Sequence, residues 1–273
     1  MYPYLVKFRL NSAPNCSQLF SFAYYMIKVK KNNCPCLTKV NFACDKELSP
    51  KLNQFEMCAD HLNKYNTTLF IGTQGSGKTS LLVNFVKKLY KKVFDRVYVF
   101  MPRSSRQSLQ PNIFEALPEE QLFEELNEET ISHVYDEVKA LSDDGKKTLI
   151  IYDDVQKALK NPTVLNSLKN IIANQRHLHV VNLILVQNFF ALHKSLREIV
   201  NNVILFKLGK SQTEKIFNEL IELHKDKFDK IRELVFDEKY NWMFMNLTTQ
   251  RIYKKFDEII FEEDDKNDEL EKK

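Results

Sequence analysis

The feature that most constrains this chain is a glycine-rich segment that follows a short apolar run. The segment reads Gly72-Thr-Gln-Gly-Ser-Gly-Lys-Thr79 and matches the pattern G-x-x-x-x-G-K-S/T at every fixed position. The chain has only 5 glycines, and three of them lie here. Residues 67–71 before it are typical of a buried strand, and the apolar spacing after it predicts an amphipathic helix from Lys78 to about Lys92. The sequence therefore predicts a strand, a phosphate-binding loop and a helix in succession.

A loop of this kind holds a nucleotide by its phosphates. Successive backbone N–H groups surround the β-phosphate at the start of a helix, where the helix dipole favours anions. Lys78 is expected to reach the β- and γ-phosphates, and the Thr79 hydroxyl is expected to ligate Mg²⁺. The predicted nucleotide-binding residues are Gly72, Thr73, Gln74, Gly75, Ser76, Gly77, Lys78, Thr79 and Ser80.

A second motif is the apolar run 149–152, which ends in two carboxylates, Asp153 and Asp154. Together with the phosphate loop this pattern indicates a Walker B strand. Asp153 is expected in the Mg²⁺ shell, and Asp154 is expected to act on the attacking water as a general base or orienting group. A carboxylate directly after the metal-binding Asp is typical of motor-type ATPases and is usually missing from nucleotide kinases and GTPases.

Apolar runs alternate with helical periodicity through the rest of the chain, which predicts an α/β fold with a mostly parallel sheet flanked by helices on both faces. Motor-type ATPases insert a strand between the phosphate-loop strand and the Walker B strand, so the expected order is 5-1-4-3-2. Gln187 ends the run 182–186 and is predicted to face the γ-phosphate. Further strands are expected at 97–101 (an additional outer strand), 148–152, 181–186 and 203–206, helices at 162–174, 212–224 and 226–236, a variable helical and acidic stretch at 111–143, and a closing hairpin at 241–247 and 251–253.

The two ends of the chain differ from its middle. Residues 1–50 are rich in lysine and are predicted to form a basic N-terminal extension, whose role as a phosphate contact or as a solvated surface stays open. Residues 257–273 are predicted to be an acidic, disordered tail. The ATPase domain is assigned to residues 51–256. The net charge of +4 is too small to indicate a polyanionic partner by itself.

No apolar stretch reaches about 18 residues, so we expect no membrane span. The N-terminus lacks a basic region followed by an apolar core, so no signal peptide is expected. Cys34 and Cys36, with Cys16 and Cys44, offer four thiols, but their spacing is not the C-x₂-C form of zinc ribbons. Isolated reduced thiols are the favoured interpretation.

One ordered set of motifs indicates which kind of ATPase the sequence resembles. Arg176-His177 precedes the strand that ends in Gln187, and Arg197 precedes the run 202–207. With the phosphate loop and the acidic pair, this set resembles the virion DNA-packaging ATPases of large DNA viruses, of the poxvirus type, within the FtsK–HerA superfamily. Relatives in virophages and virus-like transposons are similar. The resemblance covers about residues 65–210 and the closing hairpin, and it departs at Asp154, where many members have a longer Glu.

The resemblance implies an ATPase, with ATP and Mg²⁺, that drives double-stranded DNA into a preformed capsid. It implies a homo-oligomeric ring, a hexamer or a pentamer, that works with capsid or vertex proteins in the host cytoplasm, the viral factory or the virion. ATP at the subunit interfaces would meet a neighbour's arginine. Arg176 is the first candidate for this arginine finger, and Arg197 is the second.

The remaining candidates are weaker. His177 and His179 are expected to be structural or interface residues and not metal ligands. Arg103 and Arg106 are expected in a loop that lines a ring pore. Two other functions stay open: a different DNA pump or helicase of the same superfamily, and a regulatory NTPase switch that does not act on DNA. A nucleotide kinase is disfavoured, because no arginine-rich lid and no second substrate motif follow the loop.

Overall fold

The computed structural model describes residues 26–30, 62, 64–90, 92–109, 112–221 and 225–262. The chain divides into two units, Val29–Ile259 and the combination of Met1–Lys28 with Ile260–Lys273. The predicted boundary at residue 50 and the N-terminal cysteines lie outside the described residues.

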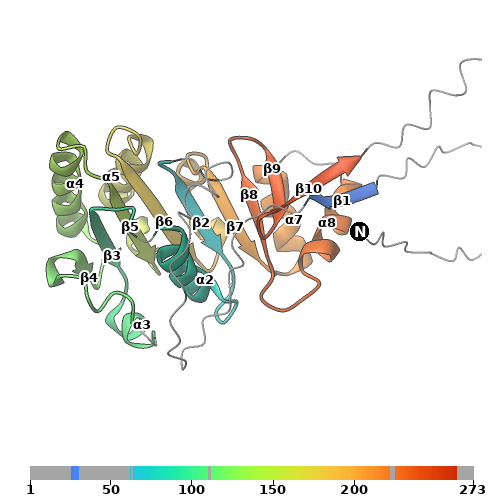
Figure 1. The fold of residues 1–273 in the computed structure, drawn as a ribbon, viewed down its shortest axis with the longest axis horizontal. Helices are drawn as coiled ribbons and strands as arrows, with labels where there is room; N and C mark the ends of the chain where they lie inside the picture. The colour runs from blue at the N-terminus through green and yellow to red at the C-terminus, as the bar shows by residue number, and fades with distance from the viewer. Residues whose placement is uncertain are drawn as a thin grey trace, which may run out of the picture. The chain divides into compact units, whose positions relative to one another are not determined.

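The centre of this unit is a sheet of five parallel strands (Figure 1). Their spatial order is β7-β2-β6-β5-β3. Numbered along the chain, this is the predicted order 5-1-4-3-2, with β6 between the phosphate-loop strand and the Walker B strand. The strands are β2 (Thr67–Ile71), β3 (Arg96–Phe100), β5 (Thr148–Asp153), β6 (Val180–Val186) and β7 (Asn202–Phe206).

Further strands extend the sheet at both edges. β8 (Trp242–Asn246) and β9 (Arg251–Lys254) form the predicted antiparallel hairpin beside β7. β10 (Asp257–Glu262) pairs antiparallel with β9, so the first 6 residues of the predicted tail form a strand instead. At the opposite edge β4 (Leu122–Phe123) pairs with β3, which is therefore not the outermost strand. A strand of 2 residues is too short to produce a recognisable alternation in the sequence.

Helices cover both faces of the sheet, with α2 (Lys78–Asn84) in front of it and α5 (Pro162–Ala173) behind it in Figure 1. The predicted helix after the phosphate loop ends early: α2 (Lys78–Asn84) continues into a π-helical turn, η1 (Phe85–Leu89). The N-cap of α5 is as predicted, because the Asn161 side chain accepts a hydrogen bond from Thr163 N at 2.9 Å and Pro162 begins the helix. The other elements are β1 (Met26–Lys30), α3 (Arg103–Gln107), η2 (Glu119–Gln121), α4 (Glu128–Asp143), η3 (Ala158–Lys160), α5 (Pro162–Ala173), η4 (Phe189–Ala191), α6 (Lys194–Arg197), α7 (Lys210–Leu220) and α8 (Lys225–Val235).

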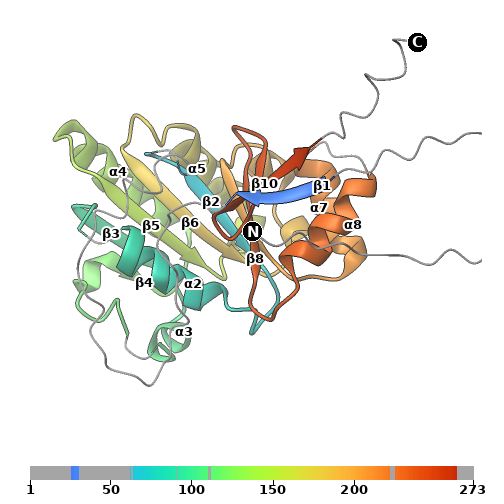
Figure 2. The ribbon, with the colours of Figure 1, turned by 45° about the vertical axis from the view of Figure 1, so that its right-hand side comes forward.

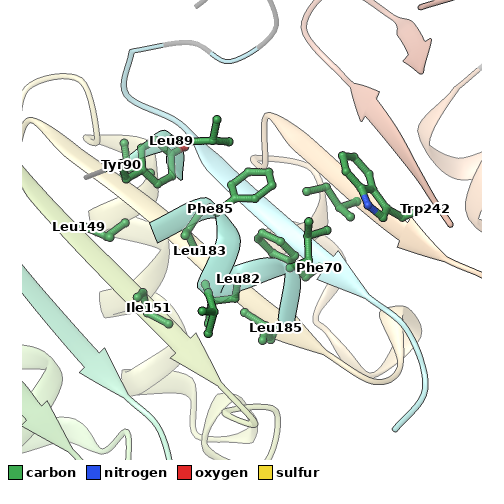
Figure 3. Close-up of a cluster of buried hydrophobic side chains, with 14 of the residues drawn as sticks. Phe70, Leu82, Phe85, Leu89, Tyr90, Leu149, Ile151, Leu183, Leu185 and Trp242 are labelled. Carbon is green, nitrogen blue, oxygen red and sulfur yellow. The ribbon is translucent and has the colours of Figure 1, made fainter. Parts of the chain in front are cut away.

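An aromatic core fixes the phosphate-loop helix to the sheet (Figure 3). Phe70 of β2 and Phe85 of the π-helical turn are both fully buried, and their rings meet edge to face at 5.3 Å. Such a pair contributes about 0.5–1.5 kcal/mol beyond the area it buries. The strand and the helix on either side of the loop are therefore held as one rigid support. Among the described helices, none combines the length and the apolar composition that a membrane crossing requires.

Candidate active site

Three loops begin side by side at the carboxyl edge of the parallel strands. Ile71 at the end of β2 is paired with Val186 at the end of β6, and Asp153 at the end of β5 is paired with Leu185. Gly72 N also donates a hydrogen bond to Val186 O at 3.2 Å. The register therefore places the start of the phosphate loop, the acidic pair and Gln187 next to one another.

Two glycines allow the phosphate loop (residues 72–79) its shape. A Cβ atom on Gly72 would lie 2.5 Å from Ser76 Oγ and 2.9 Å from Phe206 Cβ, so the loop folds over this residue without room for a side chain. Gly77 has φ of +101°, a conformation that L-residues rarely adopt. Ser76 N donates to Thr73 O at 3.2 Å and closes the turn between them. The two glycines that the sequence pattern fixes, Gly72 and Gly77, are therefore required by the shape of the loop.

Lys78 lies over the loop that precedes it. Its Nζ donates to Gly72 O at 2.6 Å and to Thr73 O at 2.9 Å. Burial lowers the pKa of Lys78, and the charges of Asp153 and Asp154 oppose that change. The ammonium group therefore interacts electrostatically with both carboxylates at the end of β5.

The two carboxylates have different environments. Asp153 is half-buried, and burial, reinforced by the charge of Asp154, raises its pKa to about 6, although Lys78 opposes the rise. Asp154 is exposed, and its φ of +56° turns the chain sharply away from the strand direction. One residue is thus suited to a cation at the strand end, and the other faces solvent beside it.

The residues here fit a magnesium ion. Mg²⁺ takes oxygen ligands and usually keeps several waters, with one or two protein ligands and the substrate phosphates completing its shell. The Thr79 hydroxyl and the Asp153 carboxylate are donors of that kind. The raised pKa of Asp153 also means that Lys78 alone does not offset its burial and the neighbouring charge of Asp154. A divalent cation would remove this imbalance.

Gln187 is exposed directly after β6, and the adjoining loops fix its surroundings. Gln156, in the loop after β5, donates through Nε2 to Asn188 O at 3.0 Å. The Asn188 side chain accepts from Phe190 N at 3.0 Å and caps the short helix η4. Gln187 therefore follows a rigid strand and precedes an anchored residue, at the edge where the phosphate loop begins.

Arg176 is not part of this cluster. It is exposed in the turn between α5 and β6, at the amino end of a strand of 7 residues, which at about 3.3 Å per residue separates it from the carboxyl edge by roughly 20 Å. The preceding Gln175 is buried, accepts from Thr67 Oγ1 at 2.7 Å and donates to Asn201 Oδ1 at 2.7 Å. The turn that carries Arg176 is thus anchored to β2, the strand of the phosphate loop, but at its other end.

Arg197, the second candidate finger, is engaged within its own chain. Its Nε and Nη2 donate to the two carboxylate oxygens of Glu219 at 2.6 Å and 3.2 Å, and its Nη1 donates to Leu192 O at 2.7 Å. Its guanidinium carbon also lies 5.0 Å from the centre of the Phe189 ring, and the side chain is only 11% exposed. These contacts favour a structural role and leave Arg176 as the stronger finger candidate.

The weaker candidates are spread over the molecule. Arg103 and Arg106 lie in the short helix α3 and not in a loop, because Pro102 sets the first turn and Arg106 N donates to Pro102 O at 3.1 Å. Arg106 pairs with Glu124 at 3.8 Å. His177 is exposed, whereas the His179 ring stacks on Tyr65 at 5.1 Å. The sequence pattern does not distinguish the surroundings of His177 from those of His179.

One residue beside the phosphate loop has no counterpart in the sequence prediction. Tyr240, in the loop between α8 and β8, lies against Gly77: the position of a Cβ on that glycine is 3.4 Å from Tyr240 Cδ1. Because the two residues are far apart along the chain, no local pattern could have brought them together. Only the pairing of β8 with β7 places this tyrosine at the carboxyl edge.

Comparison with known proteins supports the fold described above. A family model described as an AAA domain matches residues 62–200. The chain is similar in structure to the DNA-packaging ATPase B204 from Sulfolobus turreted icosahedral virus, with a TM-score of 0.54 and 15% identity over 70% of this chain and 97% of that one. It is also similar to the genome-packaging NTPase B204 from Sulfolobus turreted icosahedral virus 2 in complexes with AMP (TM-score 0.52, 15% identity) and with AMPPCP (TM-score 0.52, 14% identity), each over 70% of this chain and 96% of that one. Among curated proteins, no sequence matches this chain.

These similarities confirm, at the level of the fold, the resemblance to viral packaging ATPases that the motifs indicate.

Proposed function

Because this chain belongs to the AAA-domain family and is a P-loop ATPase, we propose that it drives double-stranded DNA into a preformed viral capsid as a ring of identical subunits. The observation that carries the proposal is the convergence of the phosphate loop, the Asp153–Asp154 pair and Gln187 at one sheet edge, with Arg176 exposed at the other. Similarity to proteins described as DNA-packaging ATPases supports the choice of substrate.

Each residue at the carboxyl edge has a role that its position supports. The backbone of residues 72–79 surrounds the phosphates of ATP, and Lys78 turns from its two carbonyl partners to the β- and γ-phosphates. Thr79 and Asp153 would hold Mg²⁺, which when bound neutralises charge on the phosphates. Asp154, exposed beside Asp153, orients the attacking water and accepts its proton.

Gln187 follows β6, which lies between the strands that carry the phosphate loop and the acidic pair. A side-chain amide there can hydrogen-bond both to the γ-phosphate and to the water that attacks it. Its neighbours are fixed by the Gln156–Asn188 hydrogen bond, so a change at the γ-phosphate can pass from Gln187 to the loops after β5 and β6. This link is how hydrolysis would be coupled to movement.

Arg176 completes the site from a neighbouring subunit. It cannot serve its own phosphate loop, because the two lie at opposite ends of the parallel strands. A head-to-tail ring, a hexamer or a pentamer, brings the amino edge of one subunit to the carboxyl edge of the next. The guanidinium then stabilises the charge that develops on the γ-phosphate. Capsid or vertex proteins would dock to such a ring in the host cytoplasm, the viral factory or the virion.

The test is steady-state ATP hydrolysis by the purified full chain, with and without long double-stranded DNA. The proposal predicts severalfold stimulation by DNA, abolished by Lys78→Ala and by Asp154→Asn. A slow rate that DNA does not change would favour the regulatory switch. Hydrolysis that survived Asp154→Asn would overturn the assigned role of this carboxylate.

A further inference from the structure

Tyr240 is unusually exposed for a large hydrophobic residue. Three such side chains are exposed among the described residues, and Tyr240, at 44%, is the most exposed of them. It lies in the loop between α8 and β8, which runs along the same sheet edge as the phosphate loop in Figures 1 and 2. Because this ring lies against the phosphate loop, it is placed to contact a nucleotide bound there.

The ring lies directly against the turn that ends the phosphate loop. A Cβ on Gly77 would lie 3.4 Å from Tyr240 Cδ1 and 3.6 Å from Phe206 Cε1, so the two aromatic residues flank this glycine. Phe206 is buried at the end of β7, whereas Tyr240 keeps nearly half of its surface in solvent. A nucleotide that extends outward from Gly77 on this side would lie beside this ring, whose centre is also 4.9 Å from Lys239 Nζ.

The backbone holds Tyr240 in a strained conformation. Its φ is +68°, which is uncommon for a bulky residue and persists only where the surroundings impose it. Asp237, three residues earlier, supplies that constraint: its carboxylate accepts from Lys254 Nζ at 2.6 Å and from Asn241 Nδ2 at 2.7 Å. Asn241 itself is buried. The loop thus presents the ring outward at a fixed place.

The direction of the nucleotide follows from the order of the strands. Asp153, Asp154 and Gln187 come from β5 and β6, which lie on one side of β2. Tyr240 comes from the loop before β8, on the β7 side of β2. The γ-phosphate must face the carboxylates, so the nucleoside end of the same molecule points away from them. It leaves the loop on the side where Tyr240 lies.

We propose that Tyr240 stacks on the base of the bound nucleotide and forms the base-binding part of the site. The proposal rests on nucleotide binding by the phosphate loop, and it adds a residue that contacts the nucleoside and not the phosphates. An aromatic ring can stack on any base, because every base has a π-face. The site would therefore gain affinity for a nucleotide over a bare chain of phosphates, through a residue that no phosphate-loop motif includes.

The experiment compares two ligands by calorimetry on the full chain: the non-hydrolysable analogue AMPPCP and inorganic tripolyphosphate, each with Mg²⁺. Tyr240→Leu keeps an apolar side chain of similar reach against Gly77 but removes the aromatic face, and Tyr240→Phe keeps that face. Tyr135→Ala, on α4, is the matched control, and Lys78→Ala reports on the phosphate loop. Thermal unfolding of each variant checks that the fold is kept.

Stacking predicts that Tyr240→Leu weakens AMPPCP binding by about tenfold and leaves tripolyphosphate binding unchanged, while Tyr240→Phe and Tyr135→Ala bind AMPPCP like the parent chain. Equal losses for both ligands in Tyr240→Leu would mean that the ring only supports the loop, and they would overturn the proposal. Unchanged AMPPCP binding would overturn it as well. Lys78→Ala should weaken both ligands; if it weakens neither, the phosphate loop is not the binding site, which is a failure of the proposed function itself.

Discussion

At the scale of a single residue, Gly77 is the most demanding position in the phosphate loop. Its φ of +101° is strained for any residue with a Cβ, at a cost of about 1–2 kcal/mol. We expect Gly77→Ala to relieve this strain by shifting the loop, and thereby to weaken AMPPCP binding by about tenfold or more. Calorimetry measures the change in AMPPCP affinity, and urea denaturation measures the change in the free energy of unfolding.

Gly145, in the turn before β5, provides the matched control. Its φ of +71° is also positive, and nothing lies within 4 Å of a Cβ placed on it. Gly145→Ala should therefore lower the free energy of unfolding by an amount comparable to Gly77→Ala. It lies at the amino end of β5, away from the phosphate loop, so nucleotide affinity should stay unchanged. If both variants lost affinity equally, the effect would reflect global stability and not the geometry of the loop.

At the scale of an element, the loop between α8 and β8 depends on one carboxylate. Partial burial raises the pKa of Asp237, but the hydrogen bonds from Lys254 and Asn241 outweigh this, so its pKa lies below the ordinary value of 3.8. A carboxyl with a lowered pKa in the folded state stabilises the protein above its unfolded pKa, and this contribution is lost as the pH falls through the folded pKa.

Asp237→Asn should therefore lower the free energy of unfolding at pH 7, by no more than about 1 kcal/mol because solvent screens this partly exposed pair. The difference from the parent chain should shrink as the pH falls from about 5 to about 3. Urea denaturation at both pH values measures it. A difference that stayed constant or grew at low pH would show that the charge of Asp237 is not what anchors the loop.

Elements with a local signal were predictable from the sequence, and those made by long-range packing were not. The phosphate loop rests on Gly72 and Gly77, whose steric needs are visible as glycines, and the start of α5 is visible as Asn161-Pro162. By contrast, the π-helical turn at Phe85–Leu89 and the short strand β4 have no periodic signature. Tyr240 reaches the loop only through the β7–β8 pairing, which no local pattern encodes.

The two candidate finger arginines show that the surroundings of a site residue could not be predicted from the sequence either. Arg176 and Arg197 look alike in sequence, because each precedes an apolar strand. They differ only in what surrounds them: Glu219 and two phenylalanines enclose Arg197, whereas Arg176 is exposed on a turn anchored by the buried Gln175. The partners of Arg197 come from other elements of the fold, so sequence reasoning could name both candidates but could not rank them on contacts.

At the scale of the whole molecule, the finger role of Arg176 requires more than one subunit. Arg176→Ala subunits keep Lys78, and Lys78→Ala subunits keep Arg176, so each alone should be nearly inactive as an ATPase. Mixed in equal amounts they should recover hydrolysis, up to about one quarter of the parent rate if neighbours assort at random in a head-to-tail ring. The measurement is ATP hydrolysis of the mixture after co-assembly. No recovery, in mixtures shown to co-assemble, would mean that Arg176 does not act across an interface.

The most direct test of the motor itself is displacement of a triplex-forming oligonucleotide from long double-stranded DNA. A subunit ring that moves along the duplex strips the third strand, whereas a protein that only binds DNA or only hydrolyses ATP does not. We expect displacement that requires ATP and is lost in Asp154→Asn, the variant that keeps the phosphate loop intact. A chain that hydrolyses ATP faster with DNA yet never displaces the third strand would contradict translocation as its function.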